Sequence, residues 1–337
     1  MLRQLLQTAR GYAVLRAAVL MYHRVAGPAT DAWELAVAPA HFEQQLRVLR
    51  ESCTLLPLLE LVARLRRGAV PPRAVALSFD DGYADNYHTA RPLLERHQVP
   101  ATFFVATGPV GHRREFWWDE LEQLFLEDEP LPPAVALPVA KEVVEVDLSA
   151  EQHLSPALRQ LHRRWSAAAA PPPTARAAAY YRVWELLKRL PHEQQQAHLR
   201  ALRAWAGRPL RPRPHHLVMT PTELLDLGRN PLFTIGAHTV THPALAALPA
   251  AVQAPELADS RQALRTATGQ PVSLLAYPYG SYGPDTPALA AAADFEAAFT
   301  TEARALTKRA DPYRLGRFQV GNWNGAELRT HLRAWLG

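Results

Sequence analysis

Three short segments, far apart in this chain, combine side chains that can bind a cation or transfer a proton, and each lies at the end of an apolar run that predicts a buried strand. They are Ser78–Gly82 (SFDDG), His238–His242 (HTVTH) and Ala276–Gly280 (AYPYG). Short, continuous apolar runs are typical of strands buried on both faces of a parallel sheet. Because the strands of a β/α barrel end at the same face, we expect the three segments to meet in space. This pattern favours an α/β fold with one composite site.

Apolar runs alternate with helical patterns along most of the chain, which predicts β/α units around a mostly parallel sheet. The expected strands are Ala17–Tyr22, Ala74–Phe79, Ala101–Ala106, Leu232–Ala237, Val272–Tyr277 and Ala297–Thr300. The expected core helices are Ala40–Glu51, Leu59–Arg67, Asn86–Gln98, Pro255–Thr268 and Gly325–Leu336. In addition, Thr220–Glu223 (TPTE) has the pattern of a capping box and predicts another helix start.

Residues 113–218 break this alternation, and we interpret them as a mainly helical insertion after the strand at Ala101–Ala106. Their helical patterns are Phe116–Glu127, Ala150–Trp165, Arg176–Leu190 and His192–Trp205, with one weak strand near Glu142–Leu148. The whole chain, residues 1–337, is therefore expected to form a single α/β domain that carries this insertion.

Composition excludes several classes of function. The net charge is +5, but arginines are scattered rather than interleaved with aromatic residues, so no nucleic-acid partner is expected. The single cysteine, Cys53, excludes an internal disulfide and a Cys-x-x-Cys zinc site. No stretch reaches about 18 apolar residues, so no transmembrane segment is expected. We expect a cytoplasmic protein, with which a peripheral membrane association through Leu2, Leu5 and Leu6 is compatible.

The paired aspartates and paired histidines predict a catalytic metal site. Histidines four residues apart fall on one face of a helical turn, so His238 and His242 would reach one cation. Asp80 and Asp81 leave a strand in different directions, so one can bind the metal while the other acts as a base. Two His and one carboxylate leave coordination positions for water and substrate. The structural alternatives are a helix N-cap for the aspartates and a hydrogen-bonded histidine.

Together, the three motifs resemble those of the polysaccharide deacetylase (NodB-homology, carbohydrate esterase family 4) superfamily. The resemblance covers about residues 16–110 and 218–320. It implies a distorted (β/α)7 barrel that forms one catalytic domain over residues 1–337, interrupted by the insertion.

The resemblance also implies roles for individual residues. Asp80 matches the catalytic base, and Asp81, His238 and His242 match the ligands of one divalent metal ion. Zinc is the expected metal, although imidazole and carboxylate also suit Co, Ni and Fe. Tyr279 matches the residue whose backbone N–H helps to hold the oxyanion, with an ordinary β-to-α loop as the alternative.

The chain departs from the family pattern at the third motif. The family has Arg where Ala276 stands, and that Arg commonly orients the catalytic base. Arg317, at the end of the strand-like segment Tyr313–Arg317, is expected to orient Asp80 instead. A surface arginine is the alternative.

A second departure concerns the general acid, because the late Leu-x-His of the family is absent. The segment Met21–Arg24 (MYHR) closes the first expected strand. It resembles the early Tyr-His of the circularly permuted branch, which includes the poly-N-acetylglucosamine deacetylases. His23 is therefore expected to protonate the leaving amide nitrogen, a task for which imidazole is suited. The alternative is a buried histidine that hydrogen-bonds a carboxylate.

Aromatic residues predict a substrate cleft, since sugar rings present apolar faces that pack on aromatic rings. Trp117 and Trp118 lie at the start of the insertion, just beyond a strand end, and Tyr277 and Pro278 belong to the third motif. All four are expected to bind substrate. For at least one of the tryptophans, the alternative is that it anchors the insertion to the barrel.

The leading hypothesis is a metal-dependent hydrolase that removes an N-acetyl group from a GlcNAc-type saccharide of the cell envelope, using water that the metal activates. The expected partner is an N-acetylated oligo- or polysaccharide, or a glycan precursor. Two alternatives stay open. One is an amidohydrolase of a cyclic amide or small N-acyl amine on the same barrel. The other is a degenerate, non-catalytic glycan-binding module, which the departure at Ala276 supports.

Overall fold

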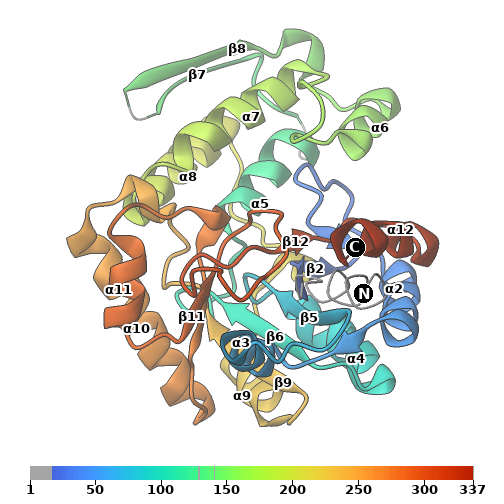
Figure 1. Ribbon diagram of the computed structural model, residues 1–337. Helices are drawn as coiled ribbons and strands as arrows, with labels where there is room; N and C mark the ends of the chain where they lie inside the picture. The colour runs from blue at the N-terminus through green and yellow to red at the C-terminus, as the bar shows by residue number, and fades with distance from the viewer. Residues whose placement is uncertain (1–16, 128–129, 140, 337) are drawn as a thin grey trace, which may run out of the picture.

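Seven parallel strands form the central sheet of this computed structural model, which describes residues 17–127, 130–139 and 141–336 (Figure 1). Their spatial order is β11–β10–β9–β6–β5–β1–β12. Their bounds are β1 Ala17–Tyr22, β5 Ala74–Phe79, β6 Ala101–Val105, β9 Phe233–Ala237, β10 Leu274–Ala276, β11 Ala297–Phe299 and β12 Phe318–Gln319. The six expected strands are confirmed, each within two residues, as is the (β/α)7 type of fold.

The last strand, β12, was not expected, because two residues carry no periodic pattern. It pairs with β1 through Leu20 and Phe318. The segment that leads into it pairs with β11, where the Leu315 N–H donates to Ala298 O at 3.0 Å and the Thr300 N–H donates to Leu315 O at 2.8 Å. The chain between β11 and β12 therefore connects the two ends of the curled sheet, and Arg317 lies in this connection.

Helices surround the sheet, as Figure 1 shows. The longer ones are α2 Pro39–Ser52, α3 Leu58–Arg67, α4 Arg91–His97, α9 Pro221–Arg229, α10 Ala250–Thr268, α11 Thr286–Ala292 and α12 Gly325–Leu336. The shorter elements are β2 Arg24–Val25, β3 Ala36–Val37, β4 Thr54–Leu55, the π-turn η1 Asn86–Ala90, and the 3₁₀ turns η5 Leu245–Ala247 and η6 Pro278–Gly280.

Hydrogen bonds to the first turn mark where α9 and α10 begin, and α10 begins earlier than expected. The capping box at Thr220 is confirmed, since the Glu223 N–H donates to Thr220 Oγ1 and the Thr220 N–H donates to Glu223 Oε2. Helix α10, expected to begin at Pro255, begins five residues earlier and continues through this proline. Its first turn is held by Pro249 O, which accepts from the Val252 and Gln253 N–H groups.

The insertion lies over one side of the barrel and has its own buried cluster (Figure 1). Its elements are α5 Trp117–Glu122, η2 Gln123–Glu127, β7 Ala134–Val139, β8 Glu142–Asp147, η3 Ser149–Glu151, α6 Pro156–Arg164, α7 Ala175–Leu187, α8 His192–Ala206 and η4 Pro214–His216. The expected weak strand is β8, but its antiparallel partner β7 was missed. The cluster continues into the barrel through Tyr83 and Ala106.

Part of what the sequence predicts about membranes concerns residues that the structure does not describe. Among the residues that the structure describes, no helix combines the length and hydropathy needed to span a bilayer. Leu2, Leu5 and Leu6 lie outside those residues, and the cytoplasmic location stays a prediction.

Candidate active site

Asp81, His238 and His242 converge at the carboxyl ends of β5 and β9. Each offers one ligand atom, and the three atoms lie within 4.8 Å of one another. His238 Nε2 is 3.4 Å and His242 Nε2 is 3.1 Å from the same oxygen, Asp81 Oδ1. All three residues are buried. A buried set of two imidazoles and one carboxylate is the donor set of a catalytic divalent metal site.

The hydrogen bonding of His238 shows that this donor set fits a cation. Its Nδ1 lies 2.8 Å from Ala276 O. A carbonyl oxygen can only accept, so Nδ1 carries a hydrogen and Nε2 is the ring nitrogen that can bind a cation. Nε2 faces the Asp81 carboxylate, so one cation can contact both groups. Ala276, where the family has Arg, thus contributes through its backbone.

The electrostatics of Asp81 and His242 favour the protonation states that bind a metal. Burial lowers the pKa of His242, which favours the neutral imidazole. Burial alone would raise the pKa of Asp81, but the His238 and His242 rings outweigh it and hold this pKa below its usual range. His242 therefore presents a neutral nitrogen beside the Asp81 carboxylate.

The expected helical turn at His238–His242 is wrong. The segment is an irregular loop, in which Thr239 (φ 66°) and His242 (φ 58°) have left-handed backbone conformations. Glu256 on α10 holds this loop from outside, because its carboxylate accepts from the Val240 N–H, the Thr241 N–H and Thr241 Oγ1 at 2.6–2.8 Å. Sequence reasoning missed Glu256, since no local pattern connects it to the histidines.

Strained backbone is concentrated at this site. Besides the two loop residues, Asp81 (φ 74°) and Tyr279 (φ 58°) also have positive φ values. Such conformations cost about 1–3 kcal/mol for non-glycine residues and persist where the surrounding structure enforces them. Gly82 (φ 88°) follows Asp81, and a Cβ there would lie 2.9 Å from Val105 Cγ1. The turn after β5 therefore requires glycine at this position.

Asp80 lies beside the metal ligands and forms a bidentate ion pair with Arg317. Arg317 Nη1 donates to Asp80 Oδ1 at 2.6 Å, and Nη2 donates to Oδ2 at 2.7 Å. The guanidinium is completely buried and also donates to Ser78 Oγ and Thr300 O. Burial alone would raise the pKa of Asp80, but the charge of Arg317, helped by His238, holds it below its usual range. Asp80 is therefore an oriented, ionised carboxylate.

His23 lies in the same pocket as the two aspartates. It is the residue between β1 and β2, and its side chain is half-buried. Asn86, in the π-turn η1, donates from Nδ2 to His23 O at 2.8 Å and fixes the backbone there. The helix expected from Asn86 to Gln98 is thus divided into η1 and α4, and a π-turn is a common feature of functional sites.

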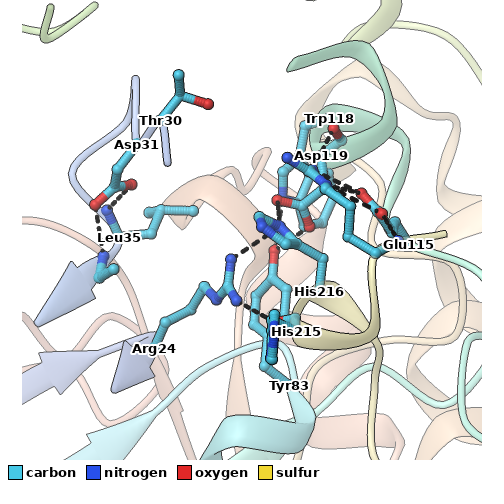
Figure 2. A network of polar contacts seen from close by, with 12 residues as sticks. Arg24, Thr30, Asp31, Leu35, Tyr83, Glu115, Trp118, Asp119, His215 and His216 are labelled. Carbon is cyan, nitrogen blue, oxygen red and sulfur yellow. Dashed lines mark hydrogen bonds and ion pairs between the residues drawn. The ribbon is translucent and has the colours of Figure 1, made fainter. Parts of the chain in front are cut away.

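A buried polar network joins the insertion to the barrel next to His242. Figure 2 shows Trp118 and Asp119 from the insertion meeting Tyr83 of the barrel. Trp118 Nε1 donates to Tyr83 Oη at 2.8 Å, and Tyr83 Oη donates to Asp119 Oδ2 at 2.6 Å. The Trp118 ring lies 4.7 Å from the His242 ring. The insertion therefore supports a metal ligand directly.

The same network reaches Arg24 at the start of β2. Arg24 is paired with Asp85 at 3.0 Å. Its Nη1 lies 3.0 Å from His216 Nδ1 (Figure 2). His216 Nδ1 also lies 3.2 Å from Asp119 Oδ1. Burial alone would raise the pKa of Asp119, but His216 and Arg24 outweigh it and hold it below its usual range. Arg24 therefore links the barrel to the C-terminal end of the insertion, and His216 links that end to Asp119 near its N-terminal end.

Four residues were expected to bind substrate, and the structure places only Trp118 among them on the pocket wall. Trp117 is buried and is not part of the pocket wall, so it anchors the insertion. Tyr277 is also buried, and its hydroxyl donates to Tyr313 O at 3.1 Å, away from the pocket. Pro278 is buried in the turn that follows. Trp118 does reach the pocket wall, although only 5% of its surface is exposed.

A pocket of about 820 Å³ opens over Asp80, Asp81 and the two histidines. Its wall includes Tyr279, whose ring lies 4.6 Å from the His242 ring. Aromatic side chains from the barrel and the insertion line the rest of it: Trp33, Trp118, Trp165, Trp184 and Trp323. The missed tryptophans come from loops and helices distant in sequence, so no motif connects them to the site.

Comparison with known proteins agrees with this geometry. The sequence profile of the polysaccharide deacetylase family matches residues 67–130 and 181–298, more than half of the chain. The chain therefore belongs to the polysaccharide deacetylase family. The poly-beta-1,6-N-acetyl-D-glucosamine N-deacetylase of Staphylococcus aureus (strain MSSA476) is 35% identical over 77 residues, which are 23% of this chain and 27% of that protein. The chain thus matches about a quarter of the length of this relative.

Solved structures share the fold at low sequence identity. The Streptococcus pyogenes deacetylase PplD, in complex with acetate, superposes with a TM-score of 0.55 and 19% identity over 95% of this chain and 99% of its own. IcaB from Ammonifex degensii gives a TM-score of 0.53 and 21% identity over 95% of this chain and 97% of its own. At this identity, the likeness supports the fold alone.

Removing the two histidines is expected to remove the metal. The double variant His238→Ala, His242→Ala leaves one carboxylate as the sole ligand of the three, so bound metal should fall from one ion per chain to a background level. Metal analysis after gel filtration measures this, with the exposed His153→Ala as a control that keeps full occupancy. Full occupancy in the double variant would disprove the ligand assignment.

Glu256→Ala is expected to weaken metal binding without removing a ligand. Residues that orient metal ligands from outside typically contribute about 10- to 100-fold in affinity, and Glu256 holds the loop between both histidines. Competition with a chromophoric chelator measures this. The control is Asp259→Ala, on the exposed side of the same helix. Equal affinities of the Glu256 variant and the wild type would show that the loop keeps its conformation unaided.

Proposed function

We propose that this protein is a metal-dependent hydrolase that removes the N-acetyl group from a GlcNAc-type saccharide. The observation that carries the proposal is the close arrangement of the Asp81, His238 and His242 donor set beside the ion-paired Asp80, at the base of an aromatic pocket. A divalent cation held by the three donors supplies Lewis-acid chemistry, since it polarises a carbonyl oxygen and lowers the pKa of water. Zinc fits this donor set, and Co, Ni and Fe also suit it.

Asp80 is proposed to act as the general base. Both of its oxygens accept from Arg317, and each keeps a further lone pair that can take a proton from water. Arg317 acts as a positioning residue, since it fixes the carboxylate and keeps it ionised. This ion pair also argues against a degenerate site, because the guanidinium that Ala276 cannot provide is present at Asp80.

His23 is proposed to donate the proton that the leaving nitrogen requires. It belongs to the same pocket as Asp80 and Asp81 but is not part of the metal donor set. An amide nitrogen leaves as an amine only after protonation, and a histidine at the pocket wall can supply that proton. The backbone N–H of Tyr279, in the strained turn after β10, is proposed to stabilise the oxyanion.

The pocket favours a saccharide over a small cyclic amide. Its volume of about 820 Å³ far exceeds what one small ring needs, and tryptophans line several of its sides. Indole faces pack against the apolar faces of sugar rings. A free or partly polymerised N-acetylated saccharide therefore fits the site better than a ureide.

Acetate release tests the function and the base together. The zinc-loaded protein is expected to release acetate from N-acetylglucosamine oligosaccharides, and Asp80→Asn should lose about 10²- to 10⁴-fold in kcat while its metal content stays unchanged. Acetate is quantified by an enzyme-coupled assay, and metal content is measured in parallel. Failure of the wild type with all four metals, on neutral and charged N-acetylated sugars alike, would contradict the proposed function.

A pair of substrates with different leaving groups tests the general acid. His23→Ala should lose about 10²- to 10⁴-fold in kcat on the acetamide but little on an activated aryl acetate, because a phenolate leaves without a proton. The exposed His153→Ala serves as the control and should leave both rates unchanged. Equal losses on amide and aryl ester would show that His23 has another role.

A further inference from the structure

The insertion contributes three cationic side chains to the wall of the pocket. Arg163 and Arg164 belong to the last turn of α6, and Lys188 directly follows α7. Within the described part of the chain, none of the three is joined to a carboxylate by an ion pair. Arg163 and Arg164 are exposed, whereas Lys188 is half-buried. Lys188 therefore differs from the buried or half-buried Arg24, Arg213 and Arg317, which all have carboxylate partners.

Lys188 lies close to the metal donor set. Its Nζ lies 4.5 Å from the centre of the Tyr279 ring and 4.8 Å from the centre of the Trp184 ring. The Tyr279 ring also lies 4.6 Å from the His242 ring, measured between ring centres. One aromatic ring therefore separates the ammonium group from a metal ligand. Burial lowers the pKa of Lys188, so its charge is partly desolvated.

Helix geometry explains only part of this arrangement. Cations in the last turn of a helix are favoured by the helix dipole, which accounts for Arg163 and Arg164 as surface residues. Lys188 is the C-cap residue of α7, so the helix dipole favours its charge too, but its ammonium is half-buried against two aromatic rings. The ring faces attract the cation and the nearby Glu185 carboxylate raises its pKa, yet burial outweighs Glu185 and the net pKa is lowered. A bound anion would offset the remaining desolvation of this charge.

The carboxylates that line the pocket belong to the barrel and not to the insertion. Asp31 and Glu34 belong to the segment between β2 and β3 on the barrel side. Asp31 accepts from the Leu35 N–H at 2.8 Å and the Ala36 N–H at 2.9 Å, and burial raises the pKa of this carboxyl group despite these hydrogen bonds. The barrel wall thus carries carboxylates, whereas the insertion wall carries cations.

We propose that the substrate is an N-acylated saccharide that carries an oxyanion, a phosphoryl or carboxylate group, near the acyl group, and that Lys188 binds this oxyanion with help from Arg163 and Arg164. The inference rests on the proposed function and names its substrate class. Lys188 is thereby a specificity-determining residue. The tryptophans beside it contact the sugar, and the two arginines at the rim attract the anion from solution.

Three matched substrates test this inference: a neutral N-acetylglucosamine oligosaccharide, its phosphorylated counterpart and its counterpart with a uronic acid. We expect the wild type to prefer an anionic member at least about tenfold in kcat/KM, the contribution of one charge-assisted hydrogen bond. Lys188→Met should raise KM for the preferred anionic substrate about tenfold. It should change KM for the neutral substrate by no more than about twofold. Lys188→Arg should restore most of the preference, and the two anionic arms distinguish phosphate from carboxylate.

The control is Arg200→Gln, which removes an exposed cation of α8 outside the pocket and should change none of these values. A wild type without preference for either anion, or equal effects of Lys188→Met on neutral and anionic substrates, would overturn the inference while the proposed function stands. Calorimetric binding of the phosphorylated and uronic sugars to metal-free protein tests the inference separately from turnover. Binding that Lys188→Met weakens supports it, and unchanged or absent binding of both anions overturns it.

Discussion

The buried ion pair between Asp80 and Arg317 is the interaction on which the rest of the site depends. Both side chains are almost completely buried, and an isolated buried carboxylate would take up a proton. The guanidinium reverses that tendency and fixes both carboxylate oxygens. Arg317 reaches Asp80 only because the segment after β11 curls back to pair β12 with β1. The return of the chain to β1 therefore also places the guanidinium that keeps Asp80, the proposed base, ionised.

The metal donor set depends on restraints from outside the three motifs. Asp81 and His242 have positive φ values, so the local sequence alone does not favour their conformations. Glu256 on α10 stabilises the loop His238–His242 in this conformation by accepting three hydrogen bonds from it. Trp118 packs against His242 from the insertion, held by Tyr83 and the network in Figure 2. The insertion is thus part of the site and contributes cations, aromatic rings and rigidity to it.

Sequence patterns predicted what is encoded locally and missed what depends on distant contacts. Continuous apolar runs located β1 and β5 to the residue, because strands buried on both faces need apolar side chains throughout. The spacing of His238 and His242 correctly indicated a shared site but wrongly a helical turn, since Glu256 imposes another conformation. Trp117 and Tyr277 looked like substrate contacts, yet burial directs both away from the pocket. No local pattern indicated the lining by Trp33 and Trp184.

A double-mutant cycle between Arg317 and Asp80 tests the central claim most directly. The quantity to measure is kcat for acetate release by Arg317→Met, Asp80→Asn and the double variant, each checked for metal content and folding. If the guanidinium acts through the carboxylate, Arg317→Met alone should lose about 100-fold, and almost nothing further in the Asp80→Asn background. Losses that multiply in the double variant would contradict this account, because Arg317 would then act independently of Asp80.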